Sequence, residues 1–113
     1  MKKKIFILVL VILIVINISA FAVTQENIEE ADELVNQANK DIEELIQEAK
    51  SKGIEKPEEV QEIINELVEE TEEISKETIE EGEELGVIII CEYIEVEING
   101  IILLIDPLRV AGW

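Results

Sequence analysis

Between residues 26 and 52, apolar or small side chains recur in steps of three and four, and this spacing constrains the fold more than any other feature. The series is Ile28, Ala31, Val35, Ala38, Ile42, Leu45 and Ala49. Such steps place all seven side chains on one side of an α-helix, as in a coiled-coil seam. Lysines occupy the last turn and Gly53 follows, so we expect the helix to end with Gly53 as its C-cap.

A second amphipathic segment begins at Pro57, a favoured first residue of a helix. Its seam is Val60, Ile64, Leu67, Thr71, Ile74 and Thr78. We expect it to end near Leu85, with Gly86 as the cap. The two segments have similar lengths and are joined by the short link 51–56, which predicts an antiparallel helical hairpin.

The period changes from helix to strand after residue 92. Ile94, Val96 and Ile98 alternate with polar side chains, and Asn99-Gly100 then gives the strongest short signal for a type I′ hairpin turn. A two-residue turn fixes the register, and the expected pairs are Ile98 with Ile101, Val96 with Leu103 and Ile94 with Ile105. Asp106-Pro107 should end the second strand, because proline has no N–H for the ladder.

The predicted fold is therefore α+β, in the order α-α-β-β: a two-helix hairpin followed by a two-stranded antiparallel β-hairpin. A hairpin of two strands is marginal by itself, so its apolar face must pack on these helices or on a second copy.

Residues 87–90 are apolar and have no partner strand in this scheme, which predicts a homo-oligomer or a protein partner. The side chains expected at the interaction surface are Ile88, Ile90, Tyr93, Ile102, Leu104 and Trp113. For Trp113, however, the favoured interpretation is that it covers an edge of the domain's own core, and docking on a partner is the alternative.

Residues 1–22 have the three parts of a secretory signal peptide in order. Three lysines precede an apolar run over residues 5–16, and Ala20-Phe21-Ala22 supplies a cleavage site. The alternative is an uncleaved hydrophobic anchor, because residues 5–23 are just long enough to cross a bilayer. In both cases we expect a small acidic domain, residues 23–113, outside the cytoplasm, either secreted or tethered to the membrane by the N-terminal segment.

The charge of this domain excludes one class of partner. Residues 23–113 hold all 27 acidic residues and six of the nine basic ones, a net charge of −21. Such a field repels nucleic-acid phosphates and anionic lipid. We therefore expect no nucleic-acid binding, and membrane contact only through the N-terminal segment.

The residue types argue against catalysis. Histidine is absent, which removes the commonest general base and metal ligand. Cys91, the single cysteine, has no base to activate it and is expected to be buried as a small hydrophobe. We predict a protein that is not an enzyme, with no catalytic, cofactor-binding or metal-binding residues.

Two acidic clusters, residues 69–73 and 80–84, leave an alternative open. They are interpreted as solvated helix faces, but carboxylates are also ligands for Ca²⁺. The favoured hypothesis is an exported, non-enzymatic interaction or structural module that makes its contacts through the β-hairpin. The alternatives are an extracellular acidic protein with weak Ca²⁺ binding, and a membrane-tethered accessory domain.

Overall fold

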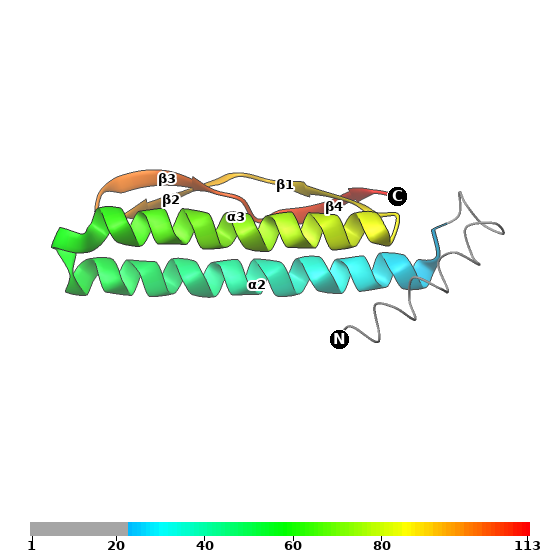
Figure 1. Ribbon diagram of the computed structural model, residues 1–113, viewed down its shortest axis with the longest axis horizontal. Coiled ribbons are helices and arrows are strands. Elements are labelled where there is room, and N and C mark those ends of the chain that lie inside the picture. Colours follow the sequence, from blue (N-terminus) through cyan, green and yellow to red (C-terminus); the bar gives the residue numbers. More distant parts are fainter. Residues whose placement is uncertain (1–22) are drawn as a thin grey trace.

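The computed structural model describes residues 23–113, so the predicted leader lies outside the described residues. Two helices lie side by side as an antiparallel hairpin, and the strands run along them (Figure 1). The elements are α2 (Gln25–Glu55), a 3₁₀ turn (Pro57–Glu59), α3 (Val60–Glu84), β1 (Ile88–Cys91), β2 (Ile94–Ile98), β3 (Ile101–Ile105) and β4 (Leu108–Gly112). The predicted α+β class and helical hairpin are confirmed.

The first helix begins where its sequence predicts but ends later. Thr24 caps its start, because the Thr24 hydroxyl accepts a hydrogen bond from the Asn27 N–H at 3.1 Å. The prediction that Gly53 ends the helix is wrong, since α2 continues to Glu55. A Cβ on Gly53 would lie only 3.1 Å from the Asn99 Oδ1 atom. The glycine therefore permits a close approach of the β-hairpin turn instead of ending the helix.

The second helix ends at a glycine in the predicted way. Gly86 has φ +78°, and its N–H donates to the Glu83 carbonyl at 3.0 Å. The Val87 N–H donates to the Gly82 carbonyl at 2.8 Å. These two bonds form a Schellman motif, which satisfies the last carbonyls of α3 and turns the chain into β1.

The buried helix faces differ slightly from the predicted seams. Ile46 and Ser75 are buried, whereas Leu45 and Ile74 are half-buried and line an open groove between the helices. The buried arc is rotated because each helix packs against the strands as well as against its partner. One core cluster joins Ile42, Ile46, Ile63, Ile64, Leu67, Val96, Ile98 and Ile105, and the other joins Ala31, Val35, Ala38, Val87, Ile89 and Leu108.

The predicted β-hairpin is confirmed in its register and in its turn. Ile98 pairs with Ile101, Val96 with Leu103 and Ile94 with Ile105. Asn99 has φ +50° and Gly100 has φ +81°. A type I′ turn requires both central residues to adopt positive φ, and Asn-Gly is the pair that does so at least cost.

The prediction of only two strands, with residues 87–90 unpaired, is wrong. The chain resumes after Asp106-Pro107 as β4, which pairs antiparallel with β1 and places Ile90 opposite Arg109. The register counted outward from the turn continues through both strand pairs. The two strand pairs are separated by residues 92–93 and 106–107, which we call the interruption. There Pro107 cannot donate, but its carbonyl accepts a hydrogen bond from the Glu92 N–H at 2.7 Å. Proline thus removes one bond and leaves the register intact. We call residues 88–113, which comprise the two strand pairs and Trp113, the β-ribbon.

The β-ribbon makes a half-turn about its long axis, so the face that packs on the helices differs between its two halves. We call this change the turnover. In β2 the side chains of Val96 and Ile98 are buried, whereas in β1 the odd-numbered Ile89 is buried and Ile88 is exposed. The inward face therefore changes at the interruption. As a result β1 and β3 lie chiefly against α3, whereas β2 and β4 lie chiefly against α2. Figure 1 shows this exchange, with β3 and β1 along the upper border and β2 and β4 below them.

Candidate functional site

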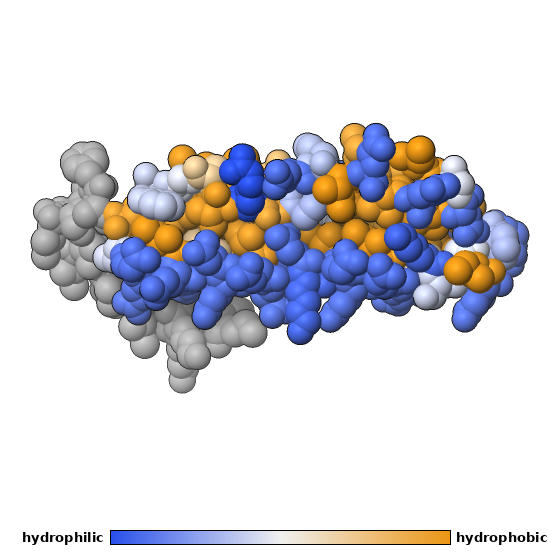
Figure 2. Space-filling view, turned by 180° about the vertical axis from the view of Figure 1, so that it is seen from behind, coloured by the Kyte–Doolittle hydropathy of each residue, from blue (hydrophilic) through white to orange (hydrophobic). Residues whose placement is uncertain are grey.

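Exposed apolar side chains gather on the β-ribbon. Residues 23–113 contain eight large hydrophobic side chains that are exposed, and one of them, Ile54, lies near the helix link. The other seven are Ile88, Tyr93, Ile94, Ile101, Ile102, Leu104 and Trp113. Figure 2 shows hydrophobic residues over the strands, in the upper part of the view, above a border of hydrophilic helix residues.

The structure places the predicted surface residues at three points along the β-ribbon. Five of the six, all except Ile90, have 57% to 68% of their surface exposed. Ile102 and Leu104 share the outer face of β3, Tyr93 lies at the interruption, and Ile88 and Trp113 lie towards the far end of the β1–β4 half.

Three hydrophobic residues differ from their predicted environment. Ile90 is half-buried opposite Arg109. Ile94 and Ile101, expected to face the helices, remain 42% and 37% exposed, because they stand at the two ends of the β2–β3 pair. Their place in the register puts them on the face opposite Ile102 and Leu104.

The two edges of the β-ribbon differ in charge. The edge formed by β1 and β3 contains no charged residue, and we call it the uncharged edge. On the opposite edge, β2 carries Glu95 and Glu97, and β4 carries Arg109. The Arg109 Nε atom lies 3.8 Å from a carboxylate oxygen of Glu92, and both side chains are exposed. Such an ion pair contributes little to stability.

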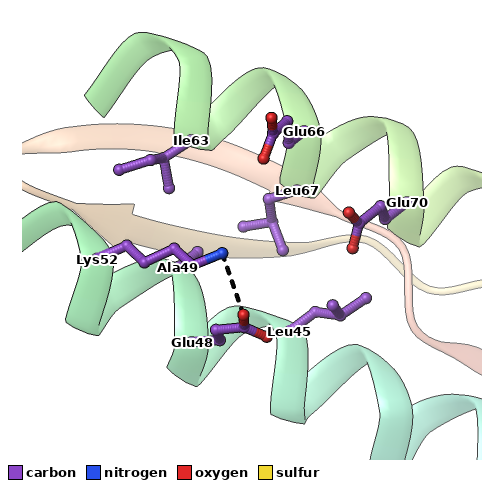
Figure 3. A pocket seen from close by; sticks show the side chains of 8 residues that line it. All are labelled: Leu45, Glu48, Ala49, Lys52, Ile63, Glu66, Leu67 and Glu70. Atoms are coloured by element: carbon purple, nitrogen blue, oxygen red, sulfur yellow. Dashed lines mark ion pairs between the residues drawn. The ribbon is translucent and has the colours of Figure 1, made fainter. Parts of the chain in front are cut away.

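An acidic groove runs between the helices (Figure 3). Leu45 and Leu67 lie in its floor, and Glu48, Glu66 and Glu70 border it. The Lys52 ammonium lies 3.1 Å from Glu48, and this hydrogen bond and charge raise the pKa of Lys52. Within residues 23–113, no three histidine, cysteine or acidic side chains are grouped so that they could hold a metal ion.

Cys91 lies beside a buried carboxylate. The predicted burial of this thiol is incomplete, because Cys91 is half-buried. Its Sγ atom lies 4.0 Å from the Asp106 Oδ2 atom. Desolvation, and secondly the negative charge of Asp106, raise the pKa of the Cys91 thiol above its usual value. The thiol is therefore protonated and weakly nucleophilic at neutral pH.

Asp106→Asn is expected to speed the reaction of Cys91 with a disulfide reagent at pH 8. Loss of the neighbouring charge lowers the thiol pKa, and the resulting rise in thiolate should increase the rate about two- to fivefold. The hydrogen bond that the Ser75 hydroxyl donates remains, because its acceptor is the Asp106 backbone carbonyl. The rate is followed by absorbance, with Glu95→Gln as a remote control, and an unchanged rate in Asp106→Asn would contradict the charge effect.

Comparison with known proteins gives no functional assignment. No protein-family model, curated protein or solved structure matches this chain. Among the helices of residues 23–113, none is long and apolar enough to cross a membrane.

Proposed function

We propose that the chain is an exported, non-enzymatic interaction module that binds a protein partner through its β-ribbon. The observation that carries the proposal is the gathering of seven of the eight exposed large hydrophobic side chains of residues 23–113 on that ribbon. Exposed apolar surface on this scale is typical of interaction sites.

The distribution of charge between the helices and the β-ribbon also supports binding through the β-ribbon. Residues 25–85 hold 23 acidic and five basic residues, whereas residues 87–113 hold four acidic residues and one basic residue. The helices keep the molecule soluble, and their charge opposes burial of the helix faces in a partner. The β-ribbon is the face that can be desolvated at the lowest electrostatic cost.

The residue types on the β-ribbon suit binding. Tyr93 and Trp113 are both more than half exposed. Tyrosine and tryptophan are enriched among the residues that dominate interface energies, because one large rigid ring buries much area with little loss of conformational freedom. Ile102 and Leu104 add an aliphatic surface on β3 between the two aromatic positions and the turn.

The test is capture of a partner by the full chain, expressed with its leader and recovered from the extracytoplasmic fraction. A double variant, Ile102→Glu with Leu104→Glu, should reduce the co-purified partner at least about tenfold, the effect of losing roughly 1.4 kcal/mol. Ile54→Glu is the matched control, because Ile54 is exposed but lies outside the β-ribbon. It should leave capture unchanged.

Two outcomes would contradict the proposal. Equal capture by the double variant and by the natural chain would place the contact elsewhere. Recovery of the chain only from the cytoplasm would contradict export. Circular dichroism of each variant establishes beforehand that the helices are retained.

A further inference from the structure

The uncharged edge presents unpaired backbone groups. Within residues 23–113, β3 pairs only with β2, and β1 only with β4. In an antiparallel pair, alternate residues direct N–H and C=O towards the partner and away from it. Ile98 and Ile101 flank the two-residue turn and face each other, so the backbone groups of Ile102 and Leu104 point away from β2. Strand β3 lies along the upper border of the molecule in Figure 1.

The opposite edge carries the features that protect edge strands, and the uncharged edge lacks them. Natural sheets blunt their edges with charges, bulges or covering groups. Glu95 and Glu97 lie on β2, and Ala111 is an extra residue in the pairing of β4 with β1. The Asn39 side chain also covers β4, by donating to the Leu108 carbonyl at 2.8 Å and accepting from its N–H at 2.7 Å. In contrast, β3 is five aliphatic residues without a charge.

The flank of α3 beside this edge is acidic. A groove between α3 and the β-ribbon, next to β1 and the interruption, is bordered by Glu72, Glu80 and Glu83, with Lys76 as its single basic side chain. A strand added to the uncharged edge would alternate its side chains between two faces. One set would lie beside Ile102 and Leu104, and the other would point towards the α3 flank.

We propose that the uncharged edge is a strand-addition site for an extended segment of a partner in which apolar and basic residues alternate. The proposal rests on the proposed function and specifies the chemistry of its partner. Apolar side chains of the segment would cover Ile102 and Leu104, and its lysine or arginine side chains would face Glu72 and Glu80. A second copy fits less well, because each copy carries a net charge of −21 over residues 23–113.

The probe is a capped seven-residue peptide that alternates lysine with isoleucine or valine, titrated calorimetrically into the exported full chain. We expect binding that weakens about tenfold between roughly 0.01 M and 0.15 M salt, as the Debye length falls from about 30 Å to about 8 Å. A peptide with glutamate in place of lysine should not bind. Equal binding of the glutamate peptide would overturn the charge assignment.

Backbone pairing is tested from both sides of the contact. The same peptide with N-methylated amides at alternate residues cannot form the ladder and should bind at least about tenfold more weakly. Leu104→Pro removes an outward N–H of β3 and should have the same effect. Glu95→Pro is the matched control, because Glu95 lies directly opposite Leu104 on the other edge. It should change binding less than about twofold.

The alternatives give distinct results. Equal binding of the N-methylated peptide would overturn strand addition even if Leu104→Pro failed to fold. Light scattering that shows a dimer of the chain, strengthened by salt and lost in Leu104→Pro, would make a second copy the occupant and overturn the proposal. Either result would overturn strand addition only. The proposed function would still hold if capture of a partner depended on Ile102 and Leu104. Equal capture by the double variant Ile102→Glu with Leu104→Glu would contradict the proposed function and strand addition together.

Discussion

Ile89→Lys is expected to unfold the β1–β4 half of the β-ribbon, whereas Ile88→Lys should leave stability nearly unchanged. Ile89 is 4% exposed and belongs to the core cluster that joins this half to the helices. A lysine there would lose the apolar contacts and bury an unpaired charge, a cost of about 4 kcal/mol or more. Since small domains are stable by only about 5–15 kcal/mol, this is a large part of the total.

Ile88 supplies the matched control because it is the next residue and more than half exposed. Its replacement by lysine should change the free energy of unfolding by no more than about 0.5 kcal/mol. Thermal unfolding followed by circular dichroism compares the two variants. If the β-ribbon kept one inward face throughout, the even-numbered Ile88 would be buried like Val96 and Ile98. A larger loss of stability in Ile88→Lys would therefore contradict the turnover of the ribbon.

The sequence predicts the helices and the hairpin turn because their signals are local. The seams of the helices need only their own spacing, and the Asn99-Gly100 pair specifies both a turn type and a register. Once that register is known, it extends without change to Ile90 and Arg109. The fourth strand could therefore have been found by counting onward past Pro107, which removes one hydrogen bond but does not end the pairing.

The turnover of the β-ribbon could not be predicted from alternation alone. Residues 87–90 are apolar at every position, so their pattern does not say which side chains face the helices. The choice depends on packing against α3. A Cβ on Gly82 would clash with the Ile89 Cδ1 atom, so the absence of a side chain there makes room for Ile89.

The roles of two glycines also depend on tertiary contacts that the local sequence does not specify. Gly53 and Gly86 follow similar amphipathic segments, and both were expected as helix caps. Gly86 has the positive φ of a cap, whereas Gly53 lies inside α2, where the β-hairpin turn approaches it. Only the tertiary contact with Asn99 distinguishes the two roles.

The sequence predicts the exposure of the six candidate residues better than their arrangement along the β-ribbon. Five of these six residues are exposed, because side chains on the outer face of the ribbon point away from the helices and no other element of residues 23–113 covers them. The difference between the two edges depends on the turnover, which brings β1 and β3 to the same border. No local pattern in the sequence contains that information.

Asn39→Ala is expected to lower the free energy of unfolding by about 2–3 kcal/mol, because it leaves the N–H and the carbonyl of Leu108 without partners. For a domain of this size the melting temperature should fall by roughly 10–20 °C. Both hydrogen bonds link α2 to β4, and they are short, at 2.8 Å and 2.7 Å. Asn36→Ala is the matched control, since Asn36 lies on the same helix and is exposed. Equal melting temperatures for the two variants would contradict a structural role for Asn39.

Asn39→Asp tests the donor role of this side chain separately from its acceptor role. An ionised carboxylate can accept from the Leu108 N–H, but it cannot donate to the Leu108 carbonyl and would face it at short range. Protonation restores a donor, so the folded state should raise the pKa of this carboxyl group. The stability it contributes is then present at low pH and lost as pH rises through the folded-state pKa. The melting-temperature difference from the natural chain should shrink below about pH 4. Asn36→Asp should show no such change, because its side chain is solvated. A pH-independent deficit in Asn39→Asp would mean that shape, and not the paired hydrogen bonds, attaches β4 to the helix.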